Sequence, residues 1–158
     1  MKKLFVLIVL IAGIVWGAEA QSKGITFEQT KEWKKVLKKA KKEKKLIFID
    51  CYTSWCGPCM REMPNIVKLY KECKGKNFEI LGVSLDSKKE AWLGAIKKNN
   101  MKWPQVSDLE MWSTAPVKLC NVTAIPYTVL IDPQGQVVAL DLRGEKLIQK
   151  VKEVLGKK

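Results

Sequence analysis

The stretch FIDCYTSWCGPCMREMP, residues 48–64, holds three of the chain's five cysteines and two of its six prolines. Within it, Cys56 and Cys59 are separated by Gly57-Pro58 and follow closely after a run of apolar residues. Two cysteines at this spacing are typical of a metal site, a structural disulfide or a redox centre. The rest of the chain bears on which of these three applies.

The first twenty residues predict a signal peptide that is removed from the mature protein. Lys2 and Lys3 precede an apolar run over residues 4–16, and residues 18–20 read A-E-A, the A-x-A pattern of a cleavage site. The run is shorter than the roughly 17 to 25 residues of a spanning helix, which makes an uncleaved membrane anchor the weaker alternative. We therefore expect a periplasmic protein without stable membrane insertion, in a compartment where disulfides persist.

The net charge of +13 is concentrated in residues 31–45, where nine lysines stand against Glu32 and Glu43. Apolar residues recur there at helical spacing, which predicts an amphipathic helix with its lysines in solvent. A surface for an acidic or membrane partner is the alternative, and no motif suggests nucleic acid. The apolar positions of this helix are Trp33, Val36, Leu37 and Ala40. The predicted organisation is a signal peptide (1–20), a basic amphipathic helical extension (21–44) and one domain (45–158).

Alternating strand and helix patterns along the domain predict an α/β fold. Helices separate most of the strands, which predicts parallel pairing, and the D-P-Q-G turn at 132–135 predicts a final antiparallel hairpin. The expected result is a central mixed β-sheet with helices on both faces. The predicted strands cover 45–53, 78–86, 102–108, 127–132 and 136–142, and the predicted helices cover 59–73, 88–99, 115–119 and 144–155.

The position of Cys56 between a strand and a helix gives the cysteine pair its chemistry. Pro58 then falls in the first helical turn, where a missing N–H costs nothing, and Cys59 lies one turn in, beside Cys56. Cys56 lies at the positive end of the helix dipole, near unpaired backbone N–H groups. Both effects favour the thiolate, which is the attacking species in disulfide exchange.

The alternatives to a redox centre have less support. The chain has no histidine, which excludes a Cys-His pair and histidine-ligated metals. Cys51, Cys56 and Cys59 fit an iron–sulfur spacing, but Cys51 lies in an apolar β-run and a fourth ligand would have to be Cys73 or Cys120. Zinc would need a second pair of ligands. A purely structural disulfide closing so short a loop would constrain the unfolded chain only slightly. We expect no metal at this site.

The W-C-G-P-C motif between an apolar strand and a helix resembles the thioredoxin superfamily. Asp50 matches the buried aspartate of that family, and Pro64 matches the proline that kinks its active-site helix. Ile125-Pro126, before a strand, matches the cis-proline that faces the disulfide. The resemblance implies a thioredoxin-like fold over about residues 25–158.

The stretch C-M-R-E-M-P resembles the C-x-x-E-x-P pattern of the TlpA/ResA-like exported thiol–disulfide oxidoreductases. The inserted helix and "WP" segment between residues 86 and 113 resemble that subgroup, as does the ending IPYTVLIDPQGQVVA…LRGE. Two departures are visible. The chain carries both Asp50 and Glu62, which leaves open which carboxylate handles the proton. Tyr127 stands where thioredoxins usually have threonine, which puts a standard substrate groove in doubt.

The resemblance implies a role for each residue of the motif. Cys56 would attack and Cys59 would resolve, with Asp50, or Asp50 and Glu62 together, taking the proton. Substrate would contact a second set of residues by adding a strand to the backbone. That set is Trp55, Gly57, Pro58, Ile125 and Pro126. Trp55 is either a core residue or a lid beside Cys56, and the resemblance favours the lid.

The implied partners are protein thiol or disulfide substrates and an upstream dithiol donor, with no cofactor, and we expect a monomer. Gly57-Pro58 offers no side-chain donor or charge, so thiolate stabilisation should be moderate and the protein should reduce its substrates. The alternatives are a disulfide oxidase or isomerase of the same fold, a thiol peroxidase, and a non-enzymatic binding module that uses the basic helix. The peroxidase would need a cysteine in a Pro/Thr-rich loop, which the chain lacks.

The three remaining cysteines lie outside the motif's chemistry. Cys51 should face the opposite side of the strand from Asp50, as a small apolar residue. Cys73 lies about 21 Å along the helix from Cys59, too far to reach the active pair. A Cys73–Cys120 bond is a further alternative.

Overall fold

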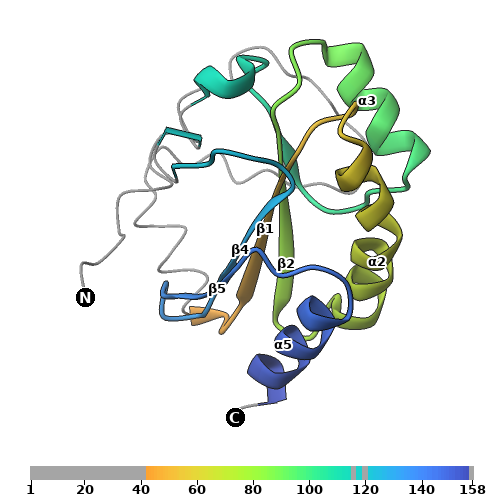
Figure 1. The fold of residues 1–158 in the computed structure, drawn as a ribbon. Helices are drawn as coiled ribbons and strands as arrows, with labels where there is room; N and C mark the ends of the chain where they lie inside the picture. Colours follow the sequence, from red (N-terminus) through yellow and green to blue (C-terminus); the bar gives the residue numbers. More distant parts are fainter. Residues whose placement is uncertain (1–41, 115–116, 119–120, 157–158) are drawn as a thin grey trace.

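The computed structural model describes residues 42–114, 117–118 and 121–156 (Figure 1). The predicted signal peptide and nearly all of the predicted basic extension lie outside these residues, as does most of the predicted helix at 115–119. The strands are β1 (Leu46–Tyr52), β2 (Phe78–Ser84), β3 (Gln105–Val106), β4 (Tyr127–Ile131) and β5 (Val137–Leu140). The helices are α2 (Gly57–Cys73), α3 (Lys89–Lys98), α5 (Gly144–Gly156) and the short 3-10 helix η2 (Met111–Ser113).

The five strands form one mixed sheet in the order β3-β2-β1-β4-β5. β2 is parallel to both β1 and β3, while β4 is antiparallel to β1 and β5 is antiparallel to β4. The predicted mixed sheet with a terminal antiparallel hairpin is confirmed. The expectation that all helix-separated strands run parallel is wrong for β4. A parallel strand needs a connection that returns along the sheet. The link from β3 to β4, residues 107–126, is long enough for such a return, so the antiparallel direction of β4 depends on where the chain enters the sheet and not on the length of the link.

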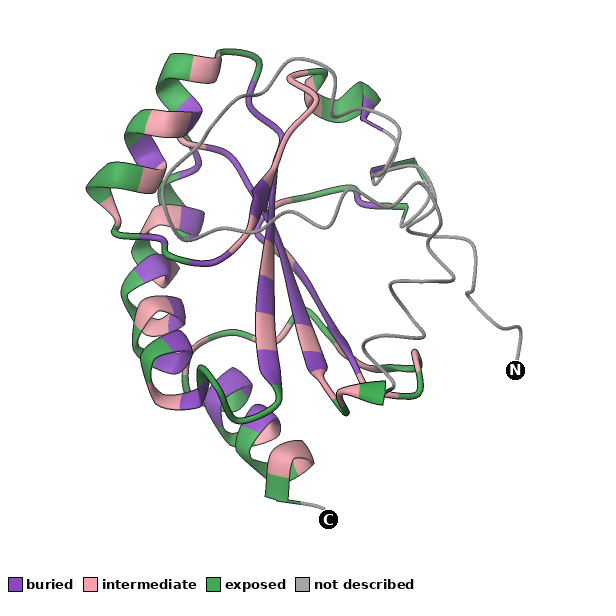
Figure 2. Ribbon diagram, turned by 180° about the vertical axis from the view of Figure 1, so that it is seen from behind, coloured by how far each residue is buried: buried purple, intermediate pink, exposed green. Residues whose placement is uncertain are grey.

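The sheet is buried on both faces by two separate apolar clusters. The first cluster joins Phe48 and Tyr52 of β1 to the inner sides of α2 and α5 and to Trp92 of α3. Figure 1 shows α2, α3 and α5 on this same side of the sheet, and Figure 2 shows their buried sides turned towards it. The second cluster lies on the opposite face and includes Val117 and Val122 of the connection to β4.

The alternation of side chains along β1 determines which of its residues face α2. Phe48 and Tyr52 belong to the α2 side of the sheet, so Asp50 between them points to that side as well. Ile49 and Cys51 belong to the cluster on the other face. The prediction that Cys51 is a small buried residue facing away from Asp50 is confirmed.

Candidate active site

The cysteine pair lies where β1 gives way to α2. Cys56 is the N-cap of the helix, and its Sγ accepts a hydrogen bond from the backbone N–H of Cys59 at 3.2 Å. Pro58 occupies the first turn, and no acidic side chain lies there to oppose the positive end of the helix dipole. Cys56 and Cys59 form a disulfide with their Cα atoms 5.2 Å apart. A thiolate released at Cys56 would therefore face a backbone N–H and the positive helix end.

Exposed residues surround a largely covered pair of sulfurs. Cys56 is 6% exposed and Cys59 is 1% exposed, so both residues are largely covered in the disulfide form. Trp55 itself is 60% exposed, which excludes the core alternative for this residue. Gly57 and Pro58 are exposed as well. A partner that reached the disulfide would meet these three residues first.

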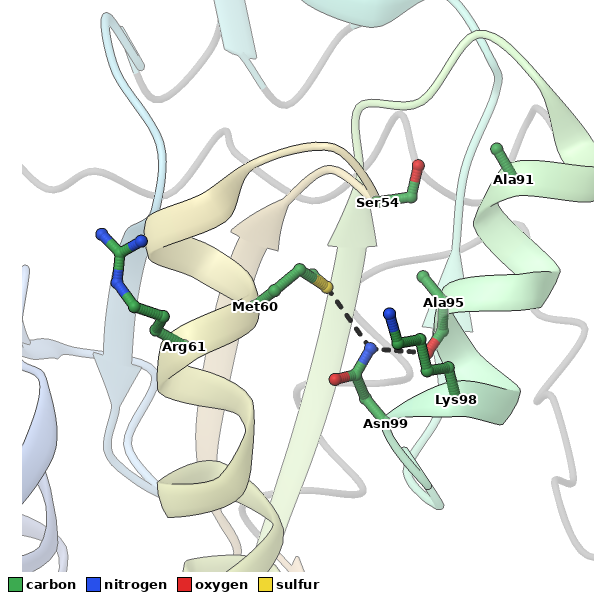
Figure 3. A pocket seen from close by; sticks show the side chains of 7 residues that line it. All are labelled: Ser54, Met60, Arg61, Ala91, Ala95, Lys98 and Asn99. Carbon is green, nitrogen blue, oxygen red and sulfur yellow. Dashed lines mark hydrogen bonds between the residues drawn. The ribbon is translucent and has the colours of Figure 1, made fainter.

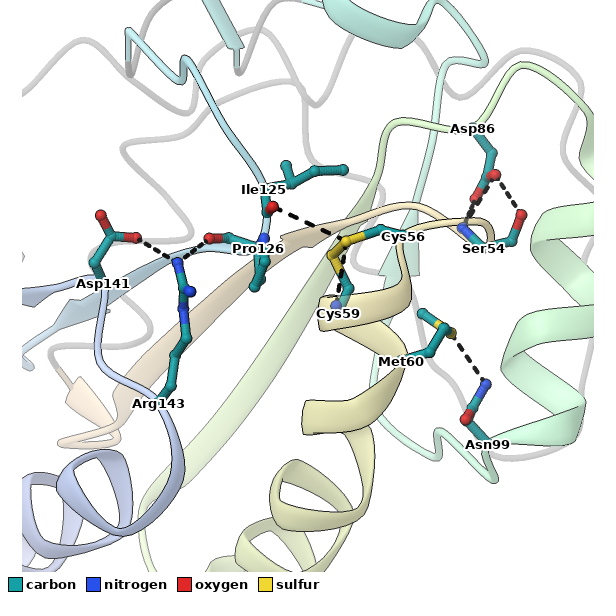
Figure 4. The surroundings of a disulfide bond; sticks show 10 residues. All are labelled: Ser54, Cys56, Cys59, Met60, Asp86, Asn99, Ile125, Pro126, Asp141 and Arg143. Atoms are coloured by element: carbon teal, nitrogen blue, oxygen red, sulfur yellow. Dashed lines mark hydrogen bonds and ion pairs between the residues drawn. A yellow bond between two sulfur atoms is a disulfide. The ribbon is translucent and has the colours of Figure 1, made fainter.

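The loop before β4 faces the disulfide from the other side (Figure 4). The Ile125–Pro126 peptide bond is cis, which confirms the geometry that the family resemblance implied. The carbonyl oxygen of Ile125 lies 3.9 Å from the Sγ of Cys56. The backbone just before β4 is therefore adjacent to the more accessible sulfur.

Asp50 is a buried acid without full hydrogen bonding. It is 1% exposed, and its Oδ2 has no hydrogen-bond partner within the described residues. The pKa of Asp50 is raised to about 7, first by burial and then by the negative charge of Glu62, while the positive charge of Arg143 lowers it. An acid with this pKa can both accept and release a proton near neutral pH.

Glu62 connects α2 to the start of α5. Its Oε1 accepts a hydrogen bond from the backbone N–H of Gly144 at 2.6 Å, and its Oε2 accepts one from the Asn65 side chain at 3.2 Å. Gly144 has a φ of +53°, a conformation that glycine adopts readily. Glu62 is therefore more than a helix-surface acid, because it is half-buried and satisfies the first N–H of another helix.

Arg143 is a site residue that the sequence reasoning missed. Its Nη2 donates a hydrogen bond to the carbonyl oxygen of Pro126 at 2.6 Å and lies 3.8 Å from Oδ1 of Asp141 (Figure 4). The signal for it was the L-R-G-E segment, which pointed to the family but not to a contact with the cis-proline loop.

Asp86 was also missed, and it holds the loop that leads into Cys56. Its carboxylate accepts hydrogen bonds from the Ser54 backbone N–H at 2.9 Å, the Ser54 hydroxyl at 2.6 Å and the Ser84 hydroxyl at 2.7 Å. Asp86 follows the carboxyl end of β2, next to the carboxyl end of β1. Parallel strands bring such residues to the same sheet edge, and this is the pattern that could have found it.

A buried hydrogen-bonded chain joins α3 to the sheet beside Asp50. The Trp92 indole N–H donates to the Tyr52 hydroxyl at 3.2 Å, and this hydroxyl donates to Oε1 of Gln105 at 2.9 Å. Gly82, the β2 neighbour of Asp50, lies against the Gln105 side chain, and a Cβ at this position would collide with it. The inserted helix is thus fixed to the strands that carry the site.

A groove of about 520 Å³ lies between α2 and α3, on the side of the disulfide away from Pro126 (Figures 3 and 4). Asn99 bridges the two helices by donating from its side chain to the sulfur of Met60 at 3.3 Å and to the Ala95 carbonyl at 2.9 Å. The groove is lined by Ser54, Met60, Arg61, Ala91, Ala95, Lys98 and Asn99.

Two further observations concern the described residues as a whole. They contain no group of three or more histidine, cysteine, aspartate or glutamate side chains placed to hold a metal ion. None of the helices in this part of the chain is long and apolar enough to cross a membrane.

Cys73 is a buried free thiol, so the alternative Cys73–Cys120 bond is not formed, and Cys120 itself lies outside the described residues.

Comparison with known proteins gives a consistent result. The model of the Thioredoxin-like family matches residues 43–137. A thiol-disulfide oxidoreductase ResA from Bacillus thuringiensis subsp. konkukian is 31% identical over 111 residues, which cover 70% of this chain and 62% of that protein. The chain thus spans about three fifths of the length of these curated relatives.

Solved structures agree. The thioredoxin domain of a thiol-disulfide oxidoreductase from Bacteroides vulgatus superposes with a TM-score of 0.67 at 31% identity, over 72% of this chain and 81% of that one. A thiol-disulfide oxidoreductase from Bacteroides fragilis gives a TM-score of 0.65 at 37% identity, over 69% and 80%.

The fold and the cysteine pair at a helix start define a dithiol protein built on a thioredoxin-like sheet. The chain belongs to the thioredoxin-like family, and the resemblance to its ResA/TlpA-like members is confirmed.

Proposed function

We propose that the chain is a thiol–disulfide oxidoreductase that reduces protein disulfides through Cys56 and Cys59. The observation that carries the proposal is the disulfide at the N-cap of α2, which lies beside the cis-proline loop and on the same face of the sheet as the buried Asp50, whose pKa is raised to about 7. The names of the relatives support the same reaction class.

The reaction starts from the reduced pair. The Cys56 thiolate attacks one sulfur of a substrate disulfide, a mixed disulfide forms, and the first substrate sulfur leaves and takes a proton. Cys59 then loses its proton and attacks the Cys56 sulfur, which releases the second substrate sulfur as a thiol. Two electrons pass to the substrate, and the Cys56–Cys59 disulfide remains. An upstream dithiol of another protein restores the reduced pair.

Asp50 is the proposed proton acceptor for Cys59. The same face of β1 that packs against α2 carries Asp50, and its raised pKa suits reversible proton transfer at neutral pH. Glu62 has a second role, because its Oε1 is already engaged by the Gly144 N–H. In this proposal Glu62 adjusts the pKa of Asp50 rather than carrying the proton itself.

Substrate backbone would pair beside Ile125 and Pro126 as an added strand. Trp55, Gly57 and Pro58, the exposed residues around Cys56, would contact the same segment from the other side. Tyr127 follows the cis-proline and is half-buried, so the groove differs from one lined by threonine at this point.

A protein-disulfide reduction assay tests the proposal. The chain from Gln21 onward, reduced with dithiothreitol, should reduce insulin disulfides, and Cys56→Ser should abolish the reaction. Cys59→Ser should instead accumulate mixed disulfides on Cys56, seen by mass mapping under non-reducing conditions. An inactive wild type, or an active Cys56→Ser variant, would reject the reductase.

The direction of electron flow needs its own measurement. Gly57-Pro58 adds no charge between the cysteines, so we expect a potential of roughly −270 mV rather than roughly −120 mV on equilibration with a glutathione buffer. A value above about −180 mV would favour the oxidase or isomerase alternative. Consumption of peroxide would favour the peroxidase. Partner binding that survives replacement of both cysteines by serine would favour the non-enzymatic module.

We further propose that the chain is exported and acts as a monomer. Supporting observations are the basic n-region, the apolar run and the A-x-A pattern before Gln21. Expression of the full chain with recovery of the periplasmic fraction should yield a protein that begins at Gln21, and sedimentation should give a monomer mass. Recovery of the uncleaved chain in the membrane fraction would favour the anchored alternative.

A further inference from the structure

Two consecutive residues after β5 contact both sides of the disulfide site. The Arg143 guanidinium donates to the Pro126 carbonyl on the cis-proline side, at 2.6 Å. The Gly144 N–H donates to Glu62 on the α2 side, also at 2.6 Å. The short segment that opens α5 therefore contacts both the cis-proline loop and α2, the helix that carries the disulfide, and Figure 4 shows the Arg143 side of this contact.

Arginine is a rare choice in this chain. Of its 29 basic residues only Arg61 and Arg143 are arginines, and the rest are lysines. A guanidinium stays charged at every pH of interest and presents several donors in a fixed plane. It can therefore hold a carbonyl oxygen with one N–H while its charge acts on a nearby acid.

Two charged groups act on Asp50, and its titratable neighbour on the same strand carries no charge. Glu62 on α2 raises its pKa, Arg143 before α5 lowers it, and Tyr52 on its own strand is neutral at these pH values because burial raises the pKa of its hydroxyl. Cys59, beside them, carries no charge while it is in the disulfide. Arg143 is thus the cation that lowers the pKa of Asp50, against the effects of burial and of Glu62.

We propose that Arg143 is a positioning residue of the dithiol site: its guanidinium holds the Pro126 carbonyl, and its charge sets the pH range in which the pair exchanges. This inference rests on the proposed oxidoreductase function. The hold on Pro126 keeps the neighbouring Ile125 carbonyl 3.9 Å from the Cys56 sulfur, where a substrate strand would pair. The charge keeps Asp50 ionised, and hence able to take a proton from Cys59, down to a lower pH.

The expected size of the charge effect is modest. The Arg143 side chain is 47% exposed, so solvent screens its charge. Loss of that charge should therefore raise the pH at which exchange becomes fast by about half a unit rather than by several units. Loss of the hold on Pro126 should act separately, by raising KM for a protein substrate with little change in kcat.

Three variants separate the two effects. R143K keeps the charge, and R143Q keeps an amide donor but loses the charge. R61Q removes the other arginine, which is exposed on α2 with its guanidinium beside Gly57 and is not among the charges that shift the pKa of Asp50. For each, kcat and KM for insulin reduction are measured from pH 5.5 to 9. R143Q should shift the rising limb of the pH profile of kcat to a higher pH, by about half a pH unit. R143K and R61Q should leave the limb in place, and both Arg143 variants should raise KM about threefold.

A second readout does not depend on activity. The ionisation of Asp50 in the oxidised protein can be followed by carboxyl infrared absorption, with Asp50→Asn identifying the band. R143Q should shift this titration upward and R143K should not. If R143Q moves neither the titration nor KM, or if R61Q moves the limb as far as R143Q does, the inference is overturned. An inactive wild type with a shifted Asp50 titration would instead reject the proposed function and leave the charge effect standing.

Discussion

Asp50 and Asp86 are two aspartates with the same burial and opposite surroundings. Each is 1% exposed; Asp50 lies in β1 two residues before its end, and Asp86 lies two residues beyond the end of the neighbouring parallel strand β2. Asp86 accepts hydrogen bonds from the Ser54 N–H, the Ser54 hydroxyl and the Ser84 hydroxyl. The Oδ2 of Asp50 has no partner among the residues the structure describes.

The difference separates a structural acid from a chemical one. A buried carboxylate with three donors is stabilised where it stands, and it fixes the loop that carries Trp55 and Cys56. A buried carboxylate with one oxygen that lacks a donor destabilises the fold when it is charged, so its presence below the helix that carries the cysteine pair favours a role in proton transfer. Changing each acid should therefore shift stability in opposite directions.

The largest expected effect is on the stability of Asp50→Asn. The folded-state pKa of about 7 lies above the ordinary 3.8, so ionising Asp50 in the fold costs up to about 4 kcal/mol. The folded protein binds the extra proton, so this cost is absent below about pH 4, grows as pH rises, and is complete above pH 7. Urea unfolding of the oxidised variant should show a gain of about 2–4 kcal/mol at pH 8 and almost none at pH 4. A gain that did not depend on pH would contradict the buried ionised state.

Asp86 should respond with the opposite sign. Asp86→Ala removes the acceptor of the Ser54 N–H and of two hydroxyls, and it should cost about 3 kcal/mol at pH 8. The same urea titration measures it, and Asp132→Ala, an acid of the exposed hairpin turn, is the control for loss of an acid that caps only local N–H groups. An Asp86→Ala variant as stable as the wild type would mean that the Ser54 loop does not depend on this carboxylate.

The third effect is the change in the rate of disulfide exchange caused by Asp50→Asn. Removing a general base typically costs about 10²-fold or more, and we expect about 100-fold slower reduction of a protein disulfide at pH 7. The loss should lie in the resolving step, so mixed disulfides on Cys56 should accumulate in rapid acid-quench experiments. A slower first attack with no accumulation would place Asp50 outside the proton transfer from Cys59.

The sequence revealed the parts of this site that are local. Cys56, Pro58 and Cys59 follow from the start of one helix, and alternation along one strand gave the buried faces of Asp50 and Cys51. α2 begins two residues before the predicted start because Gly57 and Pro58 already belong to its first turn. The cis bond at Pro126 was predicted from family resemblance alone.

What the sequence did not reveal depends on contacts between distant segments. Asp86 meets Ser54 across 32 residues, and Glu62 meets Gly144 across 82. The direction of β4 depends on where the chain crosses the sheet rather than on the order of elements. A periodic sequence pattern does not indicate which distant residues make contact, so the partners of Asp86, Glu62 and Arg143 became visible only in the folded chain.

The smallest expected effect belongs to Glu62→Gln, and it decides which carboxylate carries the proton. Glutamine keeps an oxygen that can accept from the Gly144 N–H, so the start of α5 should stay in place. It removes the negative charge that raises the pKa of Asp50, so that pKa should fall. Asp50 would then be ionised at a lower pH, and exchange at pH 6 should become about two- to threefold faster, opposite in sign to the effect of Arg143→Gln. Measurement of kcat from pH 5.5 to 9 checks the direction. Should Glu62→Gln instead slow exchange tenfold or more across this range, Glu62 would be the proton carrier, and Asp50 would be the residue that adjusts it.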